Sequence, residues 1–449
     1  MADKSRIDGI FYNPHDGVTW EKRVTKVVQD YPDAIELNLN RAYIRNGEIQ
    51  SLTQIMKGLT KLEKMNLSTN FLGNEGIELL CNWIQYLPSL QTLNLASNGF
   101  GIQGMQYLSE IIKTHTRLER LILATNSIQV ESIRCLSEAL KINDHLVYLD
   151  LSFNQLDYAS FQILSENISM HQSLRHLVLT QTFLMDSSCL HLARMLRTNT
   201  TLISLDCERN GITSVGFLYI CDALCINHSL QEWKMIENLI DESSVECLAI
   251  LLDNNTSLKT FNCTVDAMGD EGFQALSRTI QQNTTLSQLS FHTENYYIQQ
   301  NIQSISNLIK YNTTLCQLDL RSNLLPEEDL ILLYTSLEIN LSLHLFHFGS
   351  ASDPKYRELD EKVLRTLEIN SYPIRFPIEW ENKKVARIRH LQIVWNPKQH
   401  HFFPDSFQQQ IWTLLCCRKR NTITVPLLSL PSELWMHHII PWLGQLSLF

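Results

Sequence analysis

Leucines recur along most of this chain at a spacing much longer than one turn of helix or one pleat of a strand. Nine of the ten steps between successive leading leucines are 28 residues long, and the step from Leu286 to Leu315 is 29. The leading positions are Leu62, Leu90, Leu118, Leu146, Leu174, Leu202, Leu230, Leu258, Leu286, Leu315 and Leu343. A period of this length predicts a solenoid, in which each unit buries its apolar side against its neighbours.

Each unit opens with a short alternating pattern. It reads Leu-x-x-Leu-x-Leu-x-x-Asn, as in Leu146, Leu149, Leu151 and Asn154. Alternation of apolar and polar residues predicts a strand with one buried side and one exposed side. The side chain of the Asn can hydrogen-bond the backbone groups that are left unpaired where the strand ends.

The second half of each unit has the spacing of a helix. Leu156, Ser160 and Leu164 illustrate an apolar anchor, a small residue and an aliphatic residue that recur at fixed positions after the Asn. Four residues separate the small residue from the aliphatic one, so both lie on one helix face and the small one permits close packing. Another Asn, such as Asn199, precedes the next leading Leu by three residues. We expect this Asn to end the helix in a left-handed conformation.

The pattern resembles the ribonuclease-inhibitor-like subfamily of leucine-rich repeats over about residues 34–351. That resemblance implies an α/β leucine-rich-repeat solenoid, a horseshoe with parallel strands on the concave face and helices on the convex face. We predict an N-terminal cap at 1–40, with a helix near Val18–Gln29, and repeats at 41–351. The period fails from residue 352, so 352–449 is predicted to be a C-terminal capping region.

Composition narrows the class of protein. No apolar run reaches membrane-spanning length, so we expect no membrane span and a cytoplasmic location. The net charge of −10 argues against nucleic acid as a partner. The eleven cysteines are an odd number, and Cys207 and Cys263 replace strand leucines, which indicates free thiols in a reducing compartment. No catalytic, metal or cofactor site is predicted, because no group of acid, base and nucleophile or of metal ligands has suitable spacing.

Residues that could contact a partner occupy the exposed positions of the strands. Two sets differ in chemistry: an apolar zone in the first half of the repeats, and a charged group on two adjacent strands. The members are Ile122, Phe153 and Val178 for the first, and Asp206, Glu208, Arg209, Glu232, Lys234 and Glu237 for the second. Neighbouring apolar and charged side chains suit a protein partner. The structural alternative is that any solvated strand face carries some charge.

The end of the chain has a second resemblance. The residues that carry it are Leu430, Pro431, Glu433, Leu434 and Ile439. They resemble the opening helix of an F-box, which implies docking to the ubiquitin-ligase adaptor Skp1. The chain departs from the F-box pattern because His438 stands where the isoleucine is expected and Pro441 interrupts the helix. A helix that closes the core of the solenoid is the structural alternative.

Three classes of function therefore remain open. The leading hypothesis is a non-enzymatic scaffold that binds another protein on its concave face. The second is a substrate-receptor subunit of a Skp1-cullin ubiquitin ligase, with the repeats selecting the substrate. The third is a GTPase-activating protein, since the small-GTPase activator of nuclear transport shares the repeat subfamily. The Asn- and Gln-rich repeats with an F-box-like fragment also resemble effectors that bacteria secrete into the host cytosol.

Overall fold

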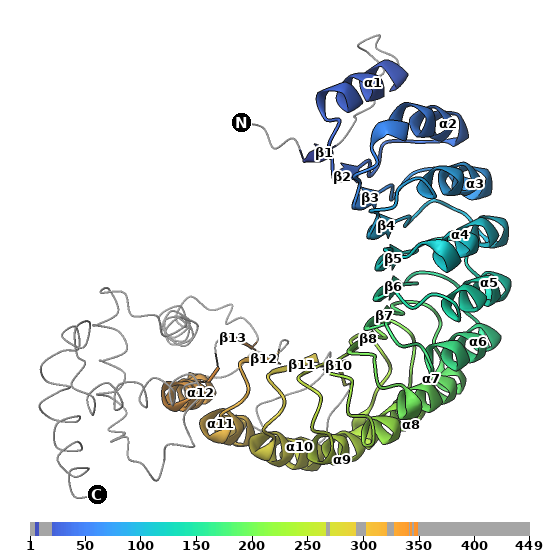
Figure 1. Cartoon of the computed structure of the whole chain (residues 1–449). Helices are drawn as coiled ribbons and strands as arrows, with labels where there is room; N and C mark the ends of the chain where they lie inside the picture. Colours follow the sequence, from blue (N-terminus) through green and yellow to red (C-terminus); the bar gives the residue numbers. More distant parts are fainter. Residues whose placement is uncertain are drawn as a thin grey trace, which may run out of the picture. The chain divides into compact units, whose positions relative to one another are not determined.

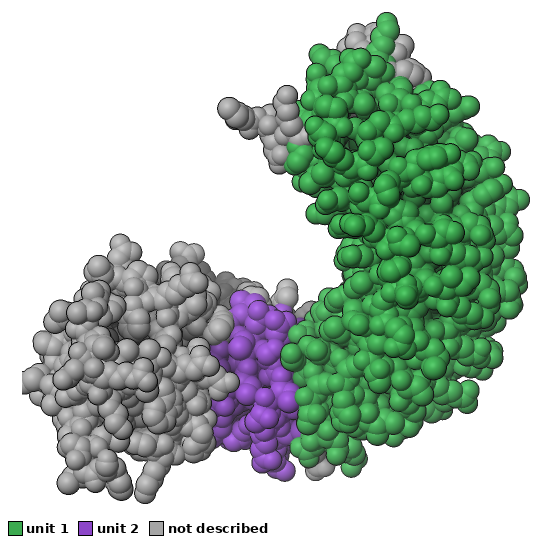
Figure 2. All heavy atoms as spheres, viewed as in Figure 1, with its two compact units in different colours: residues 1–264 green, residues 265–449 purple. Residues whose placement is uncertain are grey.

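A computed structural model describes residues 5–8, 20–265, 270–292, 302–320, 327–340, 342–343 and 345–348. The chain divides into two compact units, Met1–Thr264 and Val265–Phe449, which Figure 2 shows in green and purple. Strands and helices alternate in both units, as the repeat predicts.

The elements of unit 1 follow the 28-residue period closely. Its strands are β1 (Arg6–Asp8), β2 (Glu36–Asn38), β3 (Lys64–Asn66), β4 (Thr92–Asn94), β5 (Arg120–Ile122), β6 (Tyr148–Asp150), β7 (His176–Val178), β8 (Ser204–Asp206), β9 (Glu232–Met235) and β10 (Thr260–Thr264). Its α-helices are α1 (Trp20–Asp30), α2 (Asn46–Ile55), α3 (Gly73–Ile84), α4 (Ile102–Thr114), α5 (Val130–Leu140), α6 (Tyr158–Ile168), α7 (Asp186–Thr198), α8 (Ser214–Leu224) and α9 (Val245–Asn254). Short 3₁₀ turns at Met56–Gly58 and Glu242–Ser244 adjoin α2 and α9.

Unit 2 continues the same alternation. It contains α10 (Asp270–Gln282), β11 (Gln288–His292), α11 (Ile302–Tyr311), β12 (Gln317–Leu320), α12 (Glu327–Ile339) and β13 (Leu345–Phe348). Within this unit β12 pairs in parallel with both β11 and β13. The leading leucines Leu286, Leu315 and Leu343 are buried just ahead of these strands.

In unit 1 each strand pairs in parallel with the next one along the chain, and equivalent residues face each other. Leu121 lies opposite Leu149, and Leu149 lies opposite Leu177. Figure 1 shows the strands of this unit on its concave side and the helices on its convex side. Paired strands are about 4.8 Å apart and packed helices about 8–10 Å, so the stack must curve toward the strands. The fold is an α/β leucine-rich-repeat solenoid.

The core forms where the sequence pattern predicts it. Leu146, Leu149 and Leu151 are all fully buried. The small residue of each helix permits close packing, and Gly216 is the tightest case. A Cβ atom there would lie 2.5 Å from Asp186 Oδ1 and 2.9 Å from Cys189 Sγ, which leaves no room for any side chain.

The Asn that follows each strand forms a buried ladder, as predicted. Asn154 Nδ2 donates to the carbonyl oxygens of Leu123 (3.1 Å) and Leu151 (2.9 Å). Its Oδ1 accepts from the backbone N–H groups of Asn126 (3.1 Å) and Ile128 (3.2 Å). We call this set, which repeats at Asn70, Asn98, Asn126, Asn154, Asn210 and Asn238, the first asparagine ladder.

The Asn at the helix end was assigned the wrong conformation from the sequence. Asn199 has φ −73° and ψ 129°, which is extended backbone and not left-handed. Its Oδ1 accepts from the N–H groups of Thr201 (3.0 Å) and Leu202 (2.7 Å), and its Nδ2 donates to Ile168 O (2.8 Å). The residue therefore links two repeats through its side chain. We call the set Asn143, Asn199, Asn227, Asn255, Asn312 and Asn340 the second asparagine ladder.

Left-handed residues occur instead at the turns after β3 to β9, directly before the first-ladder Asn or, at Gln181, before Thr182. They are Thr69, Ser97, Thr125, Phe153, Gln181, Arg209 and Glu237, with φ between 51° and 58°. None of them is glycine, although a left-handed conformation is costly for residues with a Cβ atom. The turn geometry is therefore imposed by the repeat, and the sequence does not reveal it.

At the N-terminus, α1 agrees with the helix expected near Val18–Gln29. The strand β1, which pairs with β2 ahead of the first predicted strand, was not expected from the sequence. Cysteines in the described part of the chain are free thiols. No helix among the described residues has the length and apolarity needed to cross a membrane.

Candidate interaction surface on the concave face

Outward side chains of unit 1 form three rows across the concave face, because equivalent positions of neighbouring strands face each other. The first row is Arg120, Tyr148, His176, Ser204 and Glu232 on β5 to β9. The second row is Ile122, Asp150, Val178, Asp206 and Lys234 on the same strands. The third row lies just past the strand ends and comprises Ala124, Ser152, Thr180, Glu208 and Ile236.

The predicted apolar residues do not form one continuous patch. Ile122 and Val178 are half-buried in the second row, but Asp150 lies between them. Phe153 lies in the turn after β6, is 44% exposed and has a left-handed φ of 56°. A bulky aromatic side chain in this conformation is unusual, and its exposure makes it available for contact.

The first row contains an aromatic group that the sequence analysis missed. The guanidinium carbon of Arg120 lies 3.3 Å from the ring centroid of Tyr148, and the Tyr148 and His176 rings are 6.0 Å apart. Burial, followed by the nearby Asp150 carboxylate, raises the pKa of Tyr148. Burial lowers the pKa of His176, which favours the neutral imidazole. Each of these residues directly precedes the first leucine of its strand. The alternation of inward and outward positions therefore predicts that its side chain points outward, and the sequence could have identified it.

The six predicted charged residues lie together on and just after β8 and β9, and four of them form ion pairs. Lys234 Nζ lies 3.0 Å from Glu232 Oε1, and Arg209 Nη2 lies 2.8 Å from Glu237 Oε1. Although burial alone would raise it, the pKa of Glu232 is lowered by hydrogen bonds from Ser204 and Lys234. The pairs therefore hold these side chains in place.

Asp206 and Glu208 differ from the other four. Asp206 Oδ1 accepts from Thr180 Oγ1 (2.7 Å) and from the Glu208 N–H (3.1 Å). Glu208 is half-buried, and its pKa is raised by burial and then by the Asp206 carboxylate. In the described part of the chain, neither carboxylate is in salt-bridge contact with a cation. The face thus presents negative charge beside its ion pairs.

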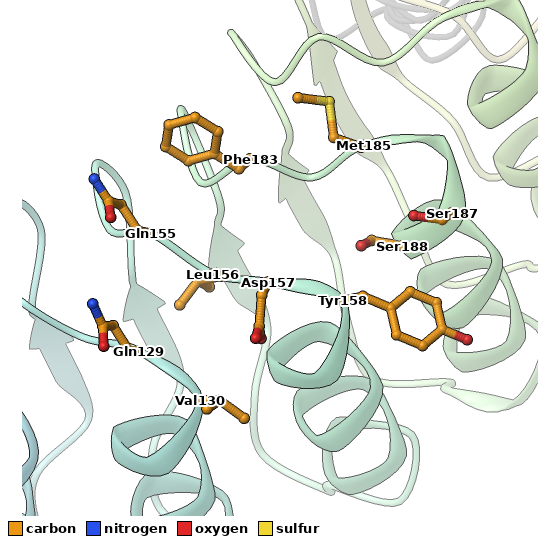
Figure 3. Close-up of a pocket in the computed structure, with 10 residues that line it drawn as sticks. All are labelled: Gln129, Val130, Gln155, Leu156, Asp157, Tyr158, Phe183, Met185, Ser187 and Ser188. Carbon is orange, nitrogen blue, oxygen red and sulfur yellow. The ribbon is translucent and has the colours of Figure 1, made fainter.

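A pocket of about 680 Å³ lies along the edge of the sheet, where the strands lead into α5, α6 and α7. Figure 3 shows Gln129 and Val130 from one repeat and Gln155 to Tyr158 from the next. The third repeat contributes Phe183, Met185, Ser187 and Ser188. Phe183 and Met185 are 52% and 47% exposed. The sequence analysis did not identify this edge, because its residues lie in the connecting turns and outside the strand pattern.

The F-box-like residues Leu430, Pro431, Glu433, Leu434 and Ile439 lie outside the described residues. Groups of three or more His, Cys, Asp or Glu side chains placed to hold a metal ion are absent from the described part of the chain.

No protein-family model matches this chain, and no curated protein matches it. Solved structures do resemble it. An internalin from Listeria monocytogenes is 18% identical over 68% of this chain and 85% of its own, with a TM-score of 0.39. The actin-binding site 2 of leiomodin-1 is 15% identical over 46% of this chain and 97% of its own, with a TM-score of 0.27. Toll-like receptor 13, in a complex with single-stranded RNA, is 18% identical over 69% of this chain and 38% of its own, with a TM-score of 0.36. None of these similarities identifies a partner.

Proposed function

We propose that unit 1 is a non-enzymatic scaffold that binds a partner protein on its concave face, across β5 to β9. The observation that carries this proposal is that residue types follow the repeat on the inward side of the strands and do not follow it on the outward side. Inward positions are apolar in every strand from β5 to β9 and mostly leucine, whereas outward positions combine apolar, aromatic and charged side chains without a period. Such a mixture is typical of protein interfaces, in which aromatic residues and arginine are enriched.

The face is also preorganised. Arg120 lies over Tyr148, and Lys234 and Arg209 are held by ion pairs, so several long side chains are already ordered before binding. Ordering a flexible side chain on binding costs conformational entropy. A surface whose side chains are already ordered avoids part of this cost and therefore binds more tightly. The helix that follows each strand in every repeat favours the ribonuclease-inhibitor-like type of repeat.

The proposal is tested by affinity purification from eukaryotic cytosol with the full chain and two matched variants. Val178→Arg places a long cation at the centre of the concave face. Ile250→Arg makes the same change on α9, where Ile250 is 52% exposed on the helical side. We expect a protein that binds the native chain and Ile250→Arg but is lost with Val178→Arg. If every retained protein is insensitive to Val178→Arg, the concave face is not the binding surface.

A further inference from the structure

The outward charge of unit 1 changes sign along the sheet. Lys64 on β3 and Arg120 on β5 are exposed cations of the first row. Toward β8 the outward side chains include the carboxylates of Asp206 and Glu208. A partner that lies across the strands therefore meets positive charge at one end and negative charge at the other, which favours one orientation.

The cations closest to the negative end are already engaged. Lys234 is the direct register partner of Asp206, but its ammonium group pairs with Glu232 at 3.0 Å. Arg209 follows Glu208 in sequence and pairs with Glu237 at 2.8 Å. Within the described residues, neither Asp206 nor Glu208 is in salt-bridge contact with a cation, although Lys234 and Arg209 are near enough to oppose the rise in the pKa of Glu208.

The surroundings of these two carboxylates make a bound cation favourable. Glu208 is half-buried between Thr180 and Ile236 of the neighbouring repeats, and it lies beside Asp206. Burial and this like charge raise the pKa of Glu208, which means that its ionised form is disfavoured in the free protein. A cation placed between the two carboxylates offsets their mutual repulsion. It also replaces part of the solvation that Glu208 loses on burial.

We propose that Asp206 and Glu208 receive an arginine side chain of the partner protein, an inference that rests on the proposed function of the concave face. The two residues are two positions apart, so their side chains leave the same side of the chain about 7 Å apart. A planar guanidinium group with five N–H donors can bind two carboxylates at once, whereas an ammonium group is a point charge. Thr180, whose hydroxyl donates to Asp206, fixes one of the two carboxylates for this contact.

The test uses the full chain and a displayed library of random peptides, with the bound sequences read after selection. We expect arginine to be enriched at one position of the peptides that bind the native chain. A synthetic peptide from this set is then measured by fluorescence anisotropy, beside versions with lysine or uncharged citrulline in place of that arginine. Citrulline should weaken binding by about tenfold or more, as expected for loss of a charge-assisted contact.

Variants of the chain locate the contact. The double variant Asp206→Asn, Glu208→Gln should weaken binding of the arginine peptide about as much as citrulline in the peptide does. When this double variant is tested with the citrulline peptide, binding should be no weaker than with either change alone. Glu242→Gln with Glu246→Gln changes the net charge equally at exposed positions on the helical side, and it should leave affinity unchanged.

Each alternative result has a distinct meaning. Peptides that are lost with Val178→Arg but bind equally well with citrulline overturn the arginine proposal and leave the concave face as the binding surface. Equal binding of lysine and arginine peptides overturns the preference for guanidinium. Peptides that are all insensitive to Val178→Arg contradict the proposed function itself.

Discussion

Polar side chains of unit 1 lie in two regions: in one the residue type repeats from copy to copy, and in the other it varies. In the first asparagine ladder, Asn70, Asn98, Asn126, Asn154 and Asn238 each donate to the carbonyl three residues back, Asn210 donates to Glu208 O, and Thr182 takes the place of the Asn in one copy. In the outward rows, Asp150, Val178 and Asp206 occupy equivalent positions on adjacent strands and share no chemistry. Residues that the repeat itself requires change little from copy to copy, whereas residues on the outward face vary. Substitutions at four positions test this division.

The largest expected effect is the loss of a ladder residue. Asn154→Ala leaves unpaired the carbonyl group of Leu151 and the N–H groups of Asn126 and Ile128, whereas the Leu123 carbonyl keeps its bond from Asn126 Nδ2. Each unsatisfied buried group costs about 1–3 kcal/mol, so we expect a loss of roughly 3 kcal/mol or more in the free energy of unfolding. Urea denaturation measures this loss.

The matched change in the outward rows is Lys234→Ala, which removes a partly exposed ion pair with Glu232. Such pairs contribute about 0–1 kcal/mol, so stability should hardly change. Equal destabilisation by Asn154→Ala and Lys234→Ala would contradict the division between the ladder and the face. Hydrogen exchange should also show that the Asn154→Ala effect is greatest in the neighbouring repeats, because each repeat packs mainly on its neighbours.

The same division explains what could be predicted from the sequence. The pattern of Leu149, Leu151 and Asn154 recurs in most copies, with Cys207 and Thr182 among the exceptions, so their inward positions and the strand follow from the period. The conformation of Asn199 did not follow, because an Asn at a helix end can either adopt a left-handed backbone or bond through its side chain. The choice depends on the Thr201 and Leu202 N–H groups that the next turn presents.

The first outward row escaped notice for a different reason. Sequence reasoning considered the positions between and after the strand leucines, and the contact of Arg120 with Tyr148 lies one position earlier. Contacts between residues 28 apart depend on the register of two strands. That register becomes certain only when the structure places equivalent residues opposite each other.

An intermediate effect is expected where histidine replaces an asparagine of the second ladder. His171 occupies the position equivalent to Asn143 and Asn199, and its Nδ1 accepts from the N–H groups of Ser173 (3.3 Å) and Leu174 (3.1 Å). Its buried Nε2 has no hydrogen-bond partner among the described residues. Because Nδ1 accepts, the neutral ring carries its proton on Nε2, a donor without an acceptor among the described residues. His171→Asn replaces it with an amide that can donate to a carbonyl, as Asn199 does to Ile168 O, so we expect the free energy of unfolding to rise by about 1 kcal/mol.

This substitution should also change the pH dependence. Burial lowers the pKa of His171 below its ordinary value of 6.5, against smaller opposing effects of Asn143 and Asp144. The unfolded chain therefore binds a proton more readily than the folded chain. The contribution of neutral His171 to stability is complete above pH 6.5 and is lost as the pH falls from there toward its lowered folded pKa. Thermal unfolding between neutral and mildly acidic pH should show a smaller decline for His171→Asn; an unchanged decline would exclude this histidine as its source.

An effect of similar size is expected at Phe153, where the two regions meet. Its backbone belongs to the repeating frame, because the seven successive turns after β3 to β9 each have a left-handed residue at this position, and its exposed side chain belongs to the variable face. Phe153→Ala and Phe153→Gly remove the same ring, but only glycine adopts φ 56° without steric cost. Glycine should therefore be more stable than alanine by about 1 kcal/mol in urea denaturation. Affinity for a concave-face partner should fall equally in both variants, since both lack the ring. If binding instead follows stability, with glycine stronger than alanine, Phe153 acts through the turn and is not itself a contact.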